Sequence, residues 1–185
     1  GSGSATIAGE WAKQDPDAAL QWANTLEGKE KSDATSKALS QMAVTDPSRA
    51  AALTEGLEGQ ALKDAYSSIA SEWAKKSWTE TESWVSGLPA EDQDSAMGAA
   101  VESLAKENPK LAATKALAMA EGEARDEAVE KVAEEMASQG DPGEAVLWVM
   151  ENGSEDAQRE TIEDVMGSWV SQDPTKARAW IDDQP

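Results

Sequence analysis

A short pattern recurs along this chain at nearly constant spacing, and it constrains the fold more than any other feature. The first copy of the pattern is Trp-Ala-Lys-Gln-Asp-Pro. The six copies begin at the start residues Trp11, Met42, Trp73, Leu104, Met136 and Trp169, which are 31, 31, 31, 32 and 33 residues apart. A period of this length is typical of arrays in which each repeat is one supersecondary unit. Such a unit cannot bury both of its faces alone, so the spacing predicts repeats stacked side by side.

Every copy contains the signature of a helix start. A residue type that caps helix N-termini follows each start residue by four or five positions, and proline follows the cap in five of the six copies. These predicted caps are Asp15, Asp46, Ser77, Asn108, Asp141 and Asp173. Small residues recur on one face of the helix that follows, at Ala19, Ala50, Thr81, Ala112, Ala145 and Ala177. We expect the tryptophans of the repeat pattern to be core residues as well, namely Trp11, Trp22, Trp73, Trp84, Trp148, Trp169 and Trp180.

A second helix precedes each start residue. Small or β-branched residues lie eight and four positions before it, as in the pairs Ala34/Ala38, Ala65/Ile69, Ala96/Ala100, Ala128/Val132 and Thr161/Val165. A stripe of this kind allows neighbouring helix backbones to approach closely. The predicted fold is therefore all-α, an αα-superhelical solenoid of about five stacked helical hairpins with half-repeats at both ends. Residues 1–4 are expected to be a remnant of the expression vector, and residues 5–185 the solenoid.

With these motifs in place, the chain resembles αα-repeat solenoids of the tetratricopeptide and HEAT type. It is also similar in pattern to degenerate Trp-Ala-x-x-Asp-Pro repeats of uncharacterised bacterial proteins. The resemblance is architectural, because the tetratricopeptide period is about 34 residues and the Gly and Tyr positions of that family's first helix have no counterpart here. It implies binding of a protein or peptide, and it transfers no role to any single residue.

The composition excludes most catalytic chemistry. Neither cysteine nor histidine occurs, which removes Ser-His-Asp and Cys-His catalysis together with thiolate and imidazole metal ligands. No glycine-rich phosphate loop is present. We therefore expect no enzymatic activity, no cofactor and no metal site. No uninterrupted apolar run reaches 18 residues and no targeting segment stands out, so we expect a soluble protein whose compartment is unknown.

Acidic residues dominate the charge, which is −20 overall. Residues 121–164 alone hold fifteen acidic side chains against three basic ones. Such a surface repels nucleic acid and anionic membranes and attracts a partner rich in lysine or arginine. Within this segment Glu130 and Glu134 are candidate partner contacts, and an ordinary solvated acidic surface is the alternative.

Two residues depart from the repeat pattern. Trp78 stands where five other copies have proline, so it either contacts a partner or packs over its own loop. Lys115 stands where other copies have Trp or Leu. Either this copy is shifted so that Leu117 fills the gap, or Lys115 lies at the edge of a groove.

The function predicted from these observations is a non-catalytic scaffold that binds a protein or peptide through an acidic surface. The alternative is a structural spacer or a segment of a longer array, natural or engineered, with no ligand of its own. An apolar end face on the terminal repeats would allow a weak dimer, so both a monomer and a weak dimer are expected states.

Overall fold

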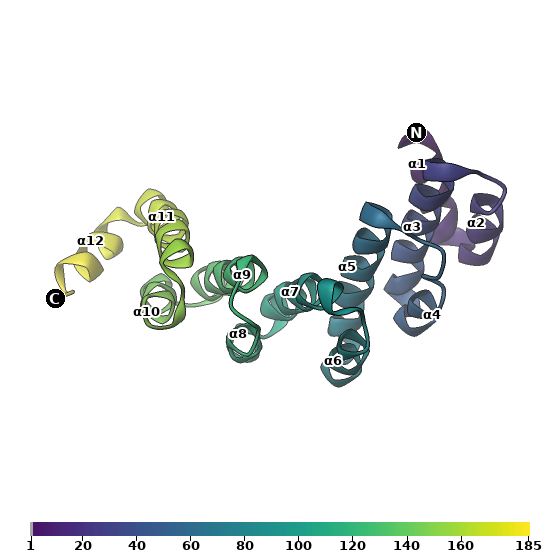
Figure 1. Ribbon diagram of the computed structural model, residues 1–185. Coiled ribbons are helices and arrows are strands. Elements are labelled where there is room, and N and C mark those ends of the chain that lie inside the picture. Colours follow the sequence, from purple (N-terminus) through teal and green to yellow (C-terminus); the bar gives the residue numbers. More distant parts are fainter. Residues whose placement is uncertain (1) are drawn as a thin grey trace. The chain divides into compact units, whose positions relative to one another are not determined.

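The computed structural model describes residues 2–185, and within them the chain forms twelve helices and no strand. The long helices are α1 (Ser2–Gln14), α3 (Gly28–Thr45), α5 (Gly59–Lys76), α7 (Ala90–Glu107), α9 (Glu123–Gln139) and α11 (Glu155–Gln172). The short helices alternate with them and are α2 (Pro16–Ala23), α4 (Pro47–Ala52), α6 (Trp78–Ser86), α8 (Pro109–Leu117), α10 (Pro142–Asn152) and α12 (Pro174–Asp182). The order gives five hairpins, from α2–α3 to α10–α11, between single helices at the two ends (Figure 1). The predicted all-α solenoid is confirmed.

All six predicted caps are confirmed. In each, the side chain accepts a hydrogen bond from a backbone N–H in the first turn of the short helix; the six are Asp15, Asp46, Ser77, Asn108, Asp141 and Asp173. At Asp46, Ser77 and Asp173 the same residue also ends the preceding long helix. The chain therefore turns from a long helix into a short one at a single residue.

Alanine forms most of the core. The predicted small face of the short helices is fully buried, with Ala19, Ala50, Thr81, Ala112, Ala145 and Ala177 all 0% exposed. The predicted stripe of the long helices is buried too, and larger side chains such as Leu39, Met42 and Val129 complete it. Because alanine keeps the helix axes close, adjacent long helices such as α1 and α3 pack along their lengths.

The expectation that the repeat tryptophans are core residues is confirmed only in part, because Trp22, Trp73 and Trp84 pack against buried clusters but none of the seven is fully buried. All seven are partly accessible, and Trp11 is 40% exposed. Three pairs of indoles, each eleven residues apart in sequence, lie with ring centroids 6.1, 5.6 and 5.7 Å apart: Trp11–Trp22, Trp73–Trp84 and Trp169–Trp180. Since the small stripes already bring the backbones together, an indole does not fit between them. It packs instead across the corner between a long helix and the next short one.

The chain divides into two compact units, Gly1–Ala100 and Val101–Pro185. In the first, α3 packs against α1 and α5, α2 and α4 each pack on the two long helices that flank them, and α6 packs on α5. In the second, α9 packs against α8, α10 and α11, and α12 packs on α11. Within each unit the contacts join helices that are consecutive or next but one in sequence, as a stack of hairpins requires.

Of the four residues expected to be a vector remnant, Gly1 lies outside the described residues and residues 2–4 form the first turn of α1. Along residues 2–185, no helix combines the length and the apolar character needed to cross a bilayer.

Candidate binding site

Equivalent positions on the long helices carry different chemistry in the two units. Ser36 of α3 lies six residues before Met42, the start residue of its copy. Its hydroxyl donates a hydrogen bond of 2.9 Å to a backbone carbonyl of α5. Ser71 of α5 lies two residues before Trp73, the start residue of the next copy. Its hydroxyl donates a hydrogen bond of 3.3 Å to a backbone carbonyl of α7. These two positions therefore face the next long helix. On α9 they are occupied by Glu130 and Glu134.

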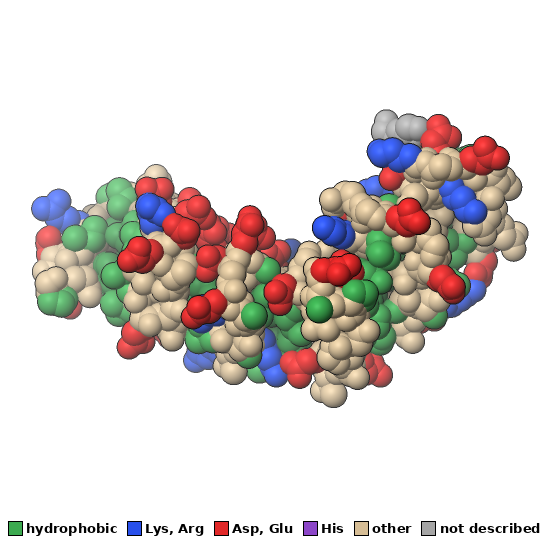
Figure 2. All heavy atoms as spheres, in the orientation of Figure 1, with side chains coloured by type: hydrophobic (Ala, Val, Ile, Leu, Met, Phe, Trp, Pro, Cys, Tyr) green, Lys and Arg blue, Asp and Glu red, His purple; other side chains and the backbone are tan. Residues whose placement is uncertain are grey.

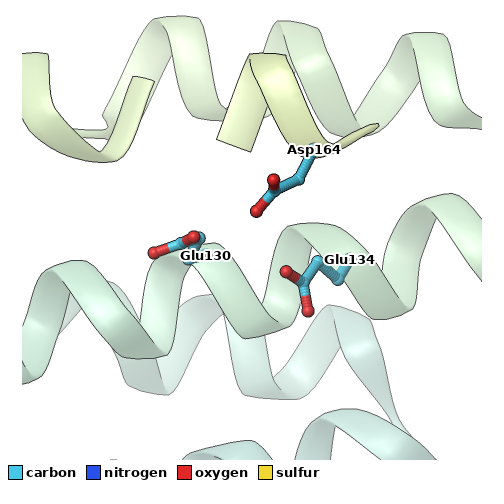
Figure 3. Close-up of side chains that lie close together, drawn as sticks. All are labelled: Glu130, Glu134 and Asp164. Atoms are coloured by element: carbon cyan, nitrogen blue, oxygen red, sulfur yellow. The ribbon is translucent and has the colours of Figure 1, made fainter. Parts of the chain in front are cut away.

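The glutamates of α9 meet an acidic residue of α11. Glu130, Glu134 and Asp164 each offer one carboxylate oxygen, and these oxygens all lie within 4.8 Å of one another. Figure 3 shows the three side chains pointing toward a common space from the two helices. The two glutamates are half-buried and Asp164 is exposed. We call these three residues the carboxylate cluster.

Burial and repulsion make it difficult for Glu130 to remain ionised. The pKa of Glu130 is raised to about 7, first because burial disfavours the charged form and then because of the nearby charge of Glu160. A hydrogen bond between these two side chains, which requires a proton, acts in the same direction, and so do the charges of Asp164 and Glu134. Near neutral pH the region therefore holds a proton that an incoming cation would displace.

Few cations compensate this charge. The ammonium of Lys131 lies 3.4 Å from the Glu134 carboxylate, which raises the pKa of that lysine. In residues 2–185 neither lysine nor arginine forms an ion pair with Glu130, Glu160 or Asp164. In Figure 2 acidic side chains gather over α9 and α11. The surface they form carries more negative charge than the basic side chains of the described residues neutralise.

A pocket opens beside the carboxylate cluster. Its volume is about 350 Å³, and its walls come from the C-terminal halves of α9 and α11 and the first residue of α10. Glu134 and Asp164 belong both to its lining and to the carboxylate cluster. The remaining lining residues are Ala137, Ser138, Pro142, Val165, Ser168, Trp169 and Gln172. The site thus combines carboxylates with an apolar and aromatic wall.

Packing holds Trp169 at this wall. Its ring centroid lies 5.7 Å from that of Trp180 on α12. Trp180 in turn covers Gly143, where an added Cβ would lie only 2.4 Å from the indole nitrogen. A glycine near the start of α10 therefore allows the tryptophan pair to close over the corner.

The first unit contains a larger hollow with different chemistry. It has a volume of about 1060 Å³ and is lined by α3, α5, the loop that precedes α5, and Ala5 of α1. Serines and glycines predominate among its lining residues, and both signs of charge are present, as in the pair Lys29 and Asp33, 3.3 Å apart. No excess charge or aromatic wall favours one class of ligand there.

Carboxylate oxygens are also the ligands that calcium and magnesium prefer, so Glu130, Glu134 and Asp164 are the residues that could hold such an ion. The three oxygens are the only ligands that the cluster brings together, whereas calcium takes six to eight and magnesium about six. Water would have to supply the rest of the coordination.

The structure places the four predicted contact residues in three different settings. Glu130 and Glu134 lie together on α9. Trp78, on α6, packs against an apolar cluster of the first unit and donates an indole hydrogen bond of 2.9 Å to Glu82. Lys115 is half-buried on α8, as is Leu117, and neither lines the pocket.

Sequence reasoning missed the partners of the two glutamates. Asp164 and Glu160 lie five and nine residues before the start residue Trp169, positions that face the preceding long helix. Aligning the facing sides of successive long helices, in addition to their buried stripes, would have paired these acids with those of α9.

Comparison with known proteins supplies no relative. No protein-family model matches the chain, and neither a curated protein nor a solved structure matches it. The resemblance to tetratricopeptide-type repeats therefore stays an architectural expectation. A function therefore has to be inferred from the chemistry of the site.

Proposed function

We propose that this protein is a non-catalytic scaffold whose second unit binds a basic segment of another protein or a peptide. The observation that carries the proposal is the carboxylate cluster between α9 and α11, with which residues 2–185 form one ion pair, between Lys131 and Glu134. The partner is a segment rich in lysine or arginine.

The energetics of like charges support this assignment. Carboxylates held within 4.8 Å of one another repel. Burial first, and then the charges of Glu160, Asp164 and Glu134, raise the pKa of Glu130 to about 7. A bound cation turns the repulsion into attraction and displaces the proton. The wider negative field of the second unit, with twenty acidic and eight basic residues, also steers a basic partner toward it.

The architecture supports a binding role in a second way. All three carboxylates project from helices packed along their lengths, so their positions depend on a rigid framework and not on a loop. The sequence contains no histidine or cysteine to serve as a base or nucleophile near neutral pH. A pre-arranged charged surface without such groups fits recognition better than catalysis.

The test is equilibrium binding of a fluorescent peptide of lysine, arginine and serine to the full chain. We expect saturable binding that weakens steeply between about 50 mM and about 300 mM salt, because screening shortens the range of the attraction. A peptide with glutamate in place of every basic residue should not bind.

A matched pair of variants localises the interaction. The triple variant E130Q/E134Q/D164N should bind the basic peptide about tenfold or more weakly, which corresponds to about 1.4 kcal/mol. The control E121Q/E151Q/E163Q removes three exposed acids of the same unit and the same total charge, and it should keep most of the affinity. Equal losses in the two variants would show that the field of the whole unit, and not the carboxylate cluster, attracts the peptide. If no basic peptide binds the wild-type chain, the spacer alternative is favoured.

A further inference from the structure

The pocket beside the carboxylate cluster is of a size that suits one side chain. Ligand pockets for small molecules span about 300–1,000 Å³, and this one, at about 350 Å³, lies near the lower limit. A helix or a folded domain would not fit into it. A single long side chain projecting from an extended partner would.

The polar atoms around this pocket are mainly hydrogen-bond acceptors. The ionised carboxylates of Glu134 and Asp164 can only accept. The side-chain amide of Gln172 donates to Ser168 Oγ at 3.1 Å, so that donor is engaged within the wall itself. The occupant should therefore carry several donors.

The apolar part of the lining constrains the occupant further. Val165 is buried and Trp169 is half-buried, and both lie on α11 beside the two carboxylates. An indole attracts a cation placed over its face, and guanidinium groups stack on aromatic rings more readily than ammonium groups do. Guanidinium also offers five donors in a planar fork that matches carboxylate oxygens, whereas ammonium offers three donors from one point.

We infer that this pocket receives an arginine side chain of the bound segment, with its aliphatic stem against Val165 and Trp169 and its guanidinium group on Glu134 and Asp164. The inference rests on the proposed function and adds to it the identity of the side chain that anchors the partner. Lysines elsewhere in the segment contribute steering, and one arginine provides the specific contact.

The experiment compares three fluorescent peptides that differ at one position. Each holds lysines and serines at the same places and has arginine, lysine or citrulline at a central site. Arginine and lysine carry the same charge, so the difference between them isolates recognition of the guanidinium group from general attraction. We expect the arginine peptide to bind the wild-type chain about tenfold more tightly than the lysine peptide, and the citrulline peptide to bind most weakly.

Variants of the pocket wall test where that preference arises. Trp169→Leu should abolish the preference for arginine over lysine. Trp73→Leu, at the same position of its repeat and likewise paired with a second indole 5.6 Å away, should keep it. Ser138→Leu fills the pocket from an exposed position of α9 without removing a charge or a tryptophan. It should also abolish the preference, and it serves if Trp169→Leu does not fold.

The assignment of the pocket to arginine and the binding of a basic segment are overturned by different results. If the arginine and lysine peptides bind wild type equally well, or if Ser138→Leu keeps the preference, the pocket assignment is overturned while the basic-segment function stands. If none of the three peptides binds, both are overturned.

Discussion

Two positions of the repeat that hold serine on long helices of the first unit hold glutamate on α9 of the second unit. The contact between neighbouring long helices is therefore a neutral hydrogen bond in the first unit and a group of carboxylates in the second. Ser36 bridges two long helices with a hydrogen bond of 2.9 Å, and its hydroxyl carries no charge. Glu130 brings a carboxylate to the equivalent place, opposite Glu160 and Asp164. Packing does not require an acid there, since serine meets the same demand elsewhere. Residues that break the local rule of a fold are candidates for function.

The raised pKa of Glu130 predicts how stability depends on pH. Because the folded chain holds this proton up to about pH 7 while an unfolded glutamate releases it near 4.5, the folded state binds more protons between these values. The free energy of unfolding should therefore fall as pH rises from about 4.5 to about 7. Urea unfolding at pH 5 and pH 8 measures this change, and the variant Glu130→Gln should lose part of it.

The control for that measurement is Glu163→Gln, which removes an exposed acid from α11. It lowers the net negative charge by the same amount without touching the carboxylate cluster. An identical pH dependence in the two variants would contradict the explanation based on Glu130.

Gly143 offers a second prediction at the scale of one residue. An added methyl group would meet the Trp180 ring at 2.4 Å, so Gly143→Ala should displace the Trp169–Trp180 pair. The overpacking should lower stability by about 1–3 kcal/mol, although alanine is otherwise the better helix former by about 1 kcal/mol. Urea denaturation gives the size of the effect. A variant as stable as wild type, or more stable, would show that the indole moves aside freely.

Sequence reasoning at this scale predicts the buried small residues and overstates the burial of the tryptophans. Ala19 and its equivalents could be predicted because a fully buried face on a closely packed helix has to be small. Trp11 and Trp169 were misplaced because recurrence at one repeat position was interpreted as burial. Recurrence shows only that a position has the same neighbours in each copy, and here those neighbours form a corner that is partly open to solvent.

At the scale of the helix, the caps determine the element order. Asp46 accepts a backbone hydrogen bond of 3.1 Å at the start of α4, the shortest helix, and ends α3 at the same time. Asp46→Ala should therefore cost about 1 kcal/mol of unfolding free energy, within the range for lost N-caps. The control Glu55→Ala changes an exposed acid in the nearby turn and should leave stability within about 0.5 kcal/mol. Equal effects would mean that the cap contributes nothing beyond its charge.

Helix starts were predictable and helix ends were not. The capping residue and the proline after it form a local signal, so each short helix begins where the sequence predicts. The end of α4 has no such signal. The chain leaves the helix at Leu53, and the Thr54 hydroxyl donates to the carbonyl of Ala51 at 3.2 Å. Leu53 is 40% exposed, whereas Trp22 and Trp84, at the same position of their repeats, are half-buried. Competition from a threonine side chain for a backbone carbonyl is a local effect that a periodicity argument does not see.

At the scale of the molecule, the packing is local and the charge is not evenly distributed. Within each unit, helices contact their neighbours along the chain, so each hairpin is stabilised mainly by the next. The first unit holds sixteen acidic and eight basic residues, and the second holds twenty and eight in a shorter length. A repeated framework with one differently charged segment is well suited to present a binding surface, because the framework can be kept while surface residues change.

The acidic segment was recognised from composition, but the site within it required the three-dimensional arrangement. Glu130 and Asp164 are separated by one short helix and two turns, and only the packing of α9 on α11 brings their carboxylates together. The pocket could not be inferred from the sequence, since its walls come from three helices.

The most direct test of the account is an NMR titration of the full chain with the arginine-containing basic peptide. We predict that the indole N–H signal of Trp169 and the backbone signals of residues 130–138 and 164–172 shift in proportion to peptide bound. The indole signals of Trp73 and Trp84 in the first unit should stay in place. Shifts centred on the first unit, or a titration that leaves the signals of α9 and α11 unchanged, would contradict the claim that the carboxylate cluster is where this protein binds its partner.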